Sequence, residues 1–143
     1  MIKVSYSLKT TGLDSYRRNL SQLSVAVGNA AADIEGNAKD SIEMNSGRYK
    51  EYYGRKEHPH FSSPPGTPPN ADTGDLANSI YNKMTSKTSA EVRVGAKYGI
   101  PLELGWTAKS GGTVPARPFL RPAVEYVAPS FQAAVKSILK GNK

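Results

Sequence analysis

An unbroken helical pattern from Leu13 to Ile42 constrains this chain more than any other feature. Its apolar residues recur at steps of three and four and so share one helical face: Leu13, Tyr16, Leu20, Leu23, Val27, Ala30, Ala31, Ile34, Ala38 and Ile42. A helix over about residues 13 to 44 would be roughly 48 Å long, at about 1.5 Å per residue. Because the chain has 143 residues, the size of one domain, we expect this helix to reach past its small core.

A row of small residues lies beside the apolar face of this helix, formed by Gly28, Ala32 and Gly36. Each glycine costs about 1 kcal/mol relative to alanine in a helix interior. Two interpretations stay open. Another backbone approaches the row closely, or the row is a weak point or bend of the helix.

Alternating apolar residues predict three strands, at residues 2–8, 79–86 and 90–95. In the first strand the alternating residues are Ile2, Val4, Tyr6 and Leu8. The other two strands form a hairpin whose inward residues are Ile80, Met84, Val92 and Val94.

Two short segments flank this hairpin. Before it, Asp72 or Thr73 can cap a short helical turn. After it, residues 98–105 predict one more helical turn, since Pro101 suits its start and Gly105 its end.

The C-terminal pattern, from about residue 118 to 140, predicts a helix that Pro129 should kink or divide. A glycine-containing loop at residues 107–116 precedes it. The predicted fold is α+β: one domain over residues 1–143, with a small, mainly antiparallel sheet packed on one face by the long N-terminal helix and the C-terminal helix.

Residues 45–72 lack aliphatic periodicity and predict a long proline-rich loop. Its first half mixes basic and aromatic residues: Arg48, Tyr49, Lys50, Tyr52, Tyr53, Arg55, Lys56 and Phe61. Such a mixture can contact nucleic acid phosphates and bases. It equally fits an arm that orders against a neighbouring protein, because tyrosine and arginine anchor interfaces.

If the loop is such an arm, its prolines restrict the unbound conformations and lower the entropy lost on docking. We therefore expect a variant without residues 47–66 to remain a folded monomer and to assemble poorly.

The sequence offers little for catalysis, since it has no nucleophile elbow, phosphate-binding loop, dinucleotide fingerprint or H-E-x-x-H motif. The nearest approach to a metal site is Glu57 with His58 and His60, but Pro59 between the histidines opposes a rigid coordination sphere. We expect no enzymatic activity, no metal and no cofactor.

Glu103 lies in an apolar turn, where its charge would be costly unless matched. Arg117 and Arg121 are the nearby basic residues in sequence. We expect a structural ion pair between Glu103 and one of these arginines, within the subunit or across an interface.

The formal net charge is +7, and the excess lies in residues 73–143, which hold ten Lys/Arg against four Asp/Glu. This permits contact with nucleic acid or an acidic protein surface, although a solvated basic face is the more common meaning. The chain has no cysteine and no apolar run long enough to span a bilayer. We expect it in the cytoplasm where it is made, away from membranes.

Three stretches in order are "SSPPGTPPNADTGDLANSI", "VGAKYGIPLELG" and "PARPFLRPAVE". Together they make the chain resemble the tail-completion or head-tail joining (neck) proteins of long-tailed bacteriophages and prophages. The first match comprises Asp72, Thr73, Gly74, Leu76, Ser79 and Ile80. The second comprises Val94, Gly95, Tyr98, Glu103 and Gly105, and the third Pro118, Phe119, Leu120, Arg121, Pro122 and Ala123. The chain departs from the family at Pro101, where a helical turn is more often uninterrupted, and at Trp106, where a small residue is more usual.

The resemblance implies a structural virion protein at the neck between the DNA-filled head and the tail. It implies a homo-oligomeric ring, of six subunits in the family, that contacts the head connector and the tail tube or terminator proteins. DNA would pass through the ring and meet a basic lumen without sequence preference. The interface candidates are Tyr49, Tyr52, Tyr53, Phe61, Asp72, Thr73, Gly74, Glu103, Trp106, Arg117 and Arg121.

Two other classes of function stay open on the sequence. A sequence-nonspecific nucleic-acid-binding module accounts for the pI of about 9.6 and for the Tyr/Arg loop. A metal-dependent hydrolase using His58 and His60 is the third hypothesis.

Overall fold

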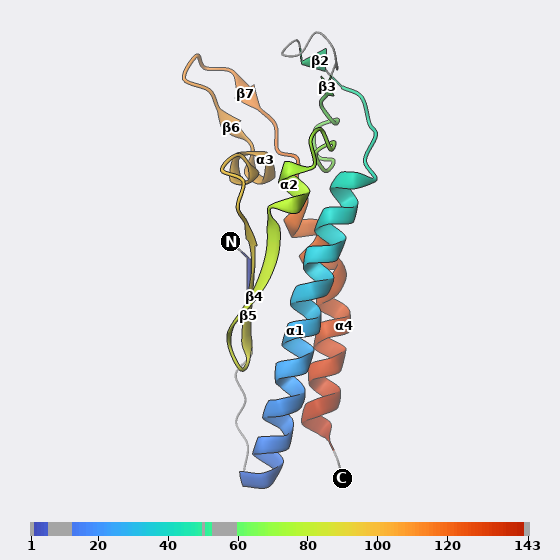
Figure 1. Ribbon diagram of the computed structural model, residues 1–143, viewed down its shortest axis with the longest axis vertical. Coiled ribbons are helices and arrows are strands. Elements are labelled where there is room, and N and C mark those ends of the chain that lie inside the picture. Colours follow the sequence, from blue (N-terminus) through green and yellow to red (C-terminus); the bar gives the residue numbers. More distant parts are fainter. Residues whose placement is uncertain (1, 6–12, 50, 53–59, 142–143) are drawn as a thin grey trace.

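Two long helices run in opposite directions along the molecule and set its elongated shape: α1 (Leu13–Glu43) and α4 (Leu120–Lys140) (Figure 1). This computed structural model describes residues 2–5, 13–49, 51–52 and 60–141. A small antiparallel sheet lies against α1, and short helices and hairpins gather at one end. The fold is α+β, which confirms the predicted class.

The apolar face predicted from the helical pattern is the buried face of α1. Within it, Leu23, Val27, Ala30, Ala31, Ile34, Ala38 and Ile42 are all buried. The same core contains residues of α4 and of the sheet, so one wide apolar stripe on α1 packs against both. Burial of these side chains is the main stabilising contribution to the helix, because an isolated helix gains little from propensity alone.

The row of small residues in α1 is not a site of close backbone approach. A Cβ added at Gly28 would meet the Met84 side chain at an ordinary 3.9 Å, and one added at Gly36 would have none of the described atoms within 4 Å. Ala32 is exposed. Among the described residues of this chain no backbone approaches the row closely, so these glycines cost α1 helix propensity without compensation from within the subunit.

The three-stranded sheet has the order β1 (Ile2–Ser5), β5 (Ser89–Val94), β4 (Ile80–Ser86), with antiparallel neighbours. The predicted hairpin is confirmed, and Ile80 opposes Val94 while Met84 opposes Ala90. The first strand was predicted to reach residue 8, and residues 6–8 lie outside the described residues.

Glu35 of α1 connects the helix to the free edge of β4. Its Oε2 accepts the Asn82 backbone N–H at 2.8 Å and the Asn82 side-chain amide at 2.6 Å, while Oε1 lies 2.6 Å from Lys39 Nζ. Burial raises the pKa of Glu35, but these hydrogen bonds and the Lys39 charge together hold it below the ordinary value. A carboxylate thus satisfies a strand N–H that none of the described strands pairs with.

Helix α4 continues through Pro129 as one helix, so the expected division does not occur. Proline removes one N–H and crowds the preceding turn. Buried residues lie on both sides of it, including Ala123, Val127 and Val135. Because packing holds both halves of the helix, the missing hydrogen bond does not end it.

Two short hairpins correct the prediction that their segments are loops. The first pairs β2 (Glu51–Tyr52) with β3 (His60–Phe61), and the second pairs β6 (Trp106–Thr107) with β7 (Thr113–Val114). Each strand has two residues, which is too short to produce a recognisable alternation in sequence.

Candidate functional site

One end of the molecule brings together the three sequence motifs that lie far apart in the chain. We call it the loop end: segment 62–73, the short helices α2 (Asp75–Asn78) and α3 (Gly99–Leu104), the β6–β7 hairpin and the start of α4. These elements lie at the upper end in Figure 1, beyond the sheet. Helix α3 confirms the helical turn predicted for residues 98–105, with Pro101 inside its first turn.

Glu103 caps the N-terminus of α4. Its Oε2 accepts the backbone N–H groups of Phe119 (2.8 Å) and Leu120 (2.9 Å), and its Oε1 accepts that of Arg121 (2.8 Å). The first N–H groups of a helix have no partner within the helix and attract negative charge. Within the subunit the predicted ion pair does not form: Arg121 contributes its backbone N–H, and the carboxylate is matched by the helix.

Arg117 is buried, with 5% of its surface exposed. Its Nε donates to the Ser63 carbonyl at 3.0 Å and its Nη1 to the Pro115 carbonyl at 3.3 Å. Its own backbone N–H donates to the Leu102 carbonyl at 2.7 Å. Arg117 thus holds the proline-rich segment, its own loop and α3 together within one subunit.

The second half of the proline-rich loop is packed against its own chain, which corrects its interpretation as a free arm. Gly66 donates its N–H to the Ala116 carbonyl at 2.9 Å, and Ser63 is fully buried. A variant without residues 47–66 would lose these contacts and leave Arg117 without its Ser63 acceptor. The expectation that this variant remains a fully folded monomer is therefore corrected: its loop end should lose structure.

Asparagine side chains fix the path of this segment. Asn70 donates to the carbonyls of Gly47 (2.6 Å) and Phe61 (2.8 Å), and Asn45 donates to that of Pro68. Arg48 lies 4.8 Å above the Phe61 ring. Side-chain amides here replace the regular backbone pairing that prolines prevent.

The turn before β4 is capped differently from the prediction. Gly74 is the N-cap of α2, with a φ of 83°, and not Asp72 or Thr73. Thr73 accepts the Asp75 N–H at 3.3 Å, while an Asp72 carboxylate oxygen lies 4.0 Å from His60 Nδ1. A left-handed conformation at this position favours glycine.

Gly105 is a second position that requires glycine. Its φ is 72°, and an added Cβ would lie 2.8 Å from both the Ala116 nitrogen and the Val114 oxygen. The turn between α3 and β6 therefore depends on the absence of a side chain.

Four large apolar side chains are exposed at the loop end: Tyr98, Ile100, Leu104 and Trp106. Their exposure contributes nothing to the stability of a monomer. The predicted candidate Trp106 is 41% exposed, while Ile100 and Leu104 are 60% and 64% exposed. The latter two were not among the candidates. Their spacing could have indicated this exposure, because Ile100, Leu102 and Leu104 cannot all face inward from one helical turn.

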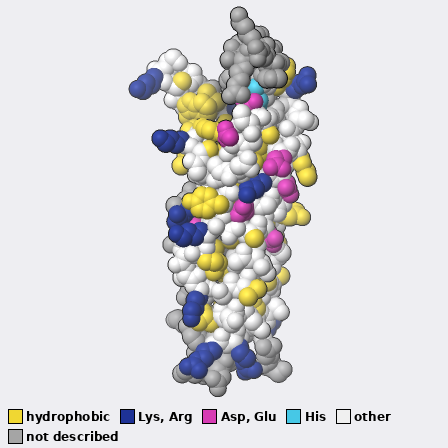
Figure 2. All heavy atoms as spheres, in the orientation of Figure 1, with side chains coloured by type: hydrophobic (Ala, Val, Ile, Leu, Met, Phe, Trp, Pro, Cys, Tyr) yellow, Lys and Arg dark blue, Asp and Glu magenta, His cyan; other side chains and the backbone are white. Residues whose placement is uncertain are grey.

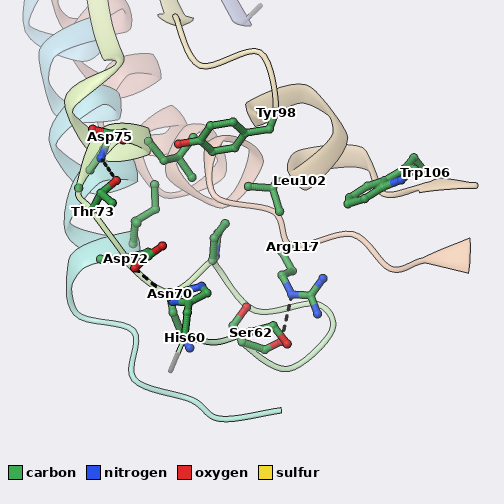
Figure 3. A pocket seen from close by; sticks show the side chains of 17 residues that line it. His60, Ser62, Asn70, Asp72, Thr73, Asp75, Tyr98, Leu102, Trp106 and Arg117 are labelled. Carbon is green, nitrogen blue, oxygen red and sulfur yellow. Dashed lines mark hydrogen bonds and ion pairs between the residues drawn. The ribbon is translucent and has the colours of Figure 1, made fainter. Parts of the chain in front are cut away.

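A cavity of about 280 Å³ lies beside these side chains (Figure 3). Its lining includes Ser63, Asn70, Asp72, Tyr98, Trp106 and Arg117. Burial raises the pKa of the Tyr98 hydroxyl, and the negative charges of Asp75 and Asp72 raise it further. The cavity therefore has acidic groups at one side and Arg117 at the other.

The remaining candidates lie apart from this cavity or outside the described residues. Tyr49 is half-exposed on the segment that precedes β2, and the backbone of Tyr52 lies in β2. Tyr53, Glu57 and His58 are outside the described residues. In the described part of the chain, no group of three or more His, Asp or Glu residues is placed to hold a metal ion.

Comparisons with protein-family models, with curated proteins and with solved structures gave no match. Over residues 13–49 and 60–141, no helix has the length and apolar character needed to cross a membrane.

Proposed function

We propose that this protein is a structural subunit of a phage particle, acting at the head-tail interface in a homo-oligomeric ring through which DNA passes. Its partners would be copies of itself, the head connector and the tail tube or terminator proteins. It would assemble in the host cytoplasm and remain in the virion. The proposal assigns it no catalytic residue and no cofactor.

The observation that carries the proposal is the loop end. The three stretches that resemble neck proteins meet there, and beside them Tyr98, Ile100, Leu104 and Trp106 are exposed. Exposed apolar side chains that are held in place by a bonded framework are typical of protein interfaces. The framework consists of Glu103, Arg117 and Gly105.

A ring requires a heterologous interface, in which one patch of a subunit meets a different patch of its neighbour. The elongated shape supports this arrangement, because the loop end and the long helices offer two separate surfaces (Figure 1). The second patch could be a groove between α1 and α4, which lies apart from the loop end. Val25, Val127 and Phe131 are among its lining residues.

The charge distribution supports contact with DNA in the channel. Figure 2 shows Lys and Arg side chains along the sheet side of the visible face and at the end opposite the loop end. Lys83 and Lys87 of the β4–β5 hairpin are exposed on the sheet. Without base-reading geometry, such charges would bind phosphates regardless of sequence.

Native mass spectrometry of the purified protein tests the proposal, alone and mixed with the other neck and tail-end proteins of the same phage. We expect a closed ring or a specific complex with one of these partners. A persistent monomer that ignores them and binds DNA with a steep salt dependence would contradict the proposal and favour a free nucleic-acid-binding module.

A further inference from the structure

The loop-end cavity contains a buried positive charge with no carboxylate partner among the described residues. Arg117 uses two of its N–H groups on the carbonyls of Ser63 and Pro115. Its Nη2 takes part in neither bond and is not one of the buried unpaired atoms, so it keeps some accessible surface. A buried charge is costly unless it is paired, and a guanidinium pairs best with a carboxylate through two parallel hydrogen bonds.

Two further polar groups of the same cavity are buried without a hydrogen-bond partner among the described residues. They are the Ser63 hydroxyl, on a residue with no exposed surface, and the Asn70 side-chain oxygen. Both residues line the cavity together with Arg117. Asn70 and Arg117 are labelled in Figure 3. Buried polar groups are rarely left unpaired in proteins, and those that are call for an explanation.

We propose that this cavity binds a carboxylate presented by a polypeptide, such as the acidic side chain of a partner protein. The carboxylate accepts hydrogen bonds from Arg117 and, after a small movement of the lining that uncovers it, from the buried Ser63 hydroxyl. A peptide N–H next to it donates to the Asn70 oxygen. One ligand thereby satisfies all three groups.

The cavity selects a carboxylate over phosphate or DNA. Asp72 and Asp75 also line it, and they repel any anion, but a multiply charged one more strongly than a single carboxylate. The volume of about 280 Å³ suits a side chain or a short peptide. The exposed positions of Asp72, Thr73 and Trp106 leave its rim open to solvent while Ser63 and Arg117 lie deeper.

The site belongs to the single subunit and does not require a ring. Its test is therefore made on the isolated protein, and a negative result would leave the proposed assembly standing. Trp106 is the single tryptophan of the chain and lines the cavity, so its fluorescence reports binding directly.

The probe is N-acetyl-aspartic acid amide, compared with N-acetyl-asparagine amide and inorganic phosphate. We expect a saturable change in Trp106 fluorescence with the aspartic probe, at a Kd in the millimolar range that suits a ligand of this size. The asparagine probe and phosphate should each bind at least about tenfold more weakly. Equal binding of the two amides, or tighter binding of phosphate, would overturn the proposal.

Ser63→Ala separates the site from the fold, whereas Arg117→Lys also loosens the contacts that hold the loop end together. Ser63→Ala should weaken the aspartic probe about fivefold without lowering stability, because its hydroxyl has no partner within the described fold. Arg117→Lys should weaken it about tenfold by removing the planar fork. Ser110→Ala, at an exposed turn outside the cavity, is the matched control and should bind like the wild type. Unchanged binding in both Ser63→Ala and Arg117→Lys would contradict the assignment.

Discussion

The body of the molecule and its loop end are held together by different forces. In the body, α1, α4 and the sheet bury aliphatic side chains such as Val27, Ile34 and Val92. At the loop end, Glu103 binds the first backbone N–H groups of α4, and Arg117 and Asn70 bind carbonyls of segments that have little regular structure. Apolar attraction is non-directional, whereas a carboxylate that accepts three N–H groups fixes the direction as well as the distance of its partners. The loop end is thus built to hold exposed side chains in place.

Ile34→Ala tests the body and should have the largest effect. Ile34 is 2% exposed in the core of α1. Removing its branched side chain should lower the free energy of unfolding by about 2–5 kcal/mol, through lost burial and the cavity left behind. Urea unfolding measures this. The milder Ile34→Val should cost about 1 kcal/mol, and an equal cost for the two variants would contradict the apolar account of the body.

Glu103→Ala tests the loop end. It leaves three N–H groups at the start of α4 without their charged acceptor, so we expect a loss of about 2–3 kcal/mol in unfolding free energy. Glu125→Ala removes a charge from an exposed position of the same helix and is the control. If both variants lost the same stability, the cap would have no special role.

Glu35→Gln tests the link between α1 and β4, which is a carboxylate contact within the body. The hydrogen bonds from Lys39 and Asn82 hold the pKa of Glu35 below its ordinary value of 4.5. Its contribution is therefore complete above the unfolded-state pKa and is lost as the pH falls through the lowered folded-state pKa. We expect the variant to lose about 1 kcal/mol at pH 7.

Unfolding curves at neutral and acidic pH check this dependence. The stability difference between wild type and Glu35→Gln should shrink as the solution becomes more acid. A difference that stays constant or grows toward low pH would show that the Glu35 charge does not stabilise the link between α1 and β4.

Gly36→Ala should have the smallest effect, and it should stabilise the body. An alanine there meets none of the described atoms within 4 Å, and Gly36 lies inside α1. We expect a gain of about 0.5–1 kcal/mol, seen as a higher Tm. Gly111→Ala, at the loop end, should instead lower the stability of the protein. An added side chain there also meets no described atom within 4 Å, but the φ of 85° is unfavourable for alanine. A destabilising Gly36→Ala would point to a neighbour of this helix face.

The body was largely predictable from the sequence because its elements repeat a period. The spacing of Leu23, Val27 and Ile34 predicted α1, and the alternation around Ile80 and Val92 predicted the hairpin. Of the two effects predicted for Pro129, a kink or a division, the division does not occur, since packing on both sides of it keeps α4 continuous.

The loop end was predictable only in part, because its bonds join residues that no local pattern connects. Glu103 accepts N–H groups 16 to 18 residues further along the chain, and Arg117 reaches a carbonyl 54 residues earlier. The sequence identified both residues as structural candidates, but it expected Glu103 to pair with the charge of Arg117 or Arg121. Backbone partners carry no signature in the identity of the residues that provide them.

The most direct test of the central claim, that the loop end is the surface that meets a partner, is hydrogen exchange of the protein before and after assembly. We predict slower exchange in the assembled state at residues 98–107, where the exposed apolar side chains lie, relative to the free subunit. Assembly that leaves residues 98–107 unchanged while protecting other surfaces would contradict the account.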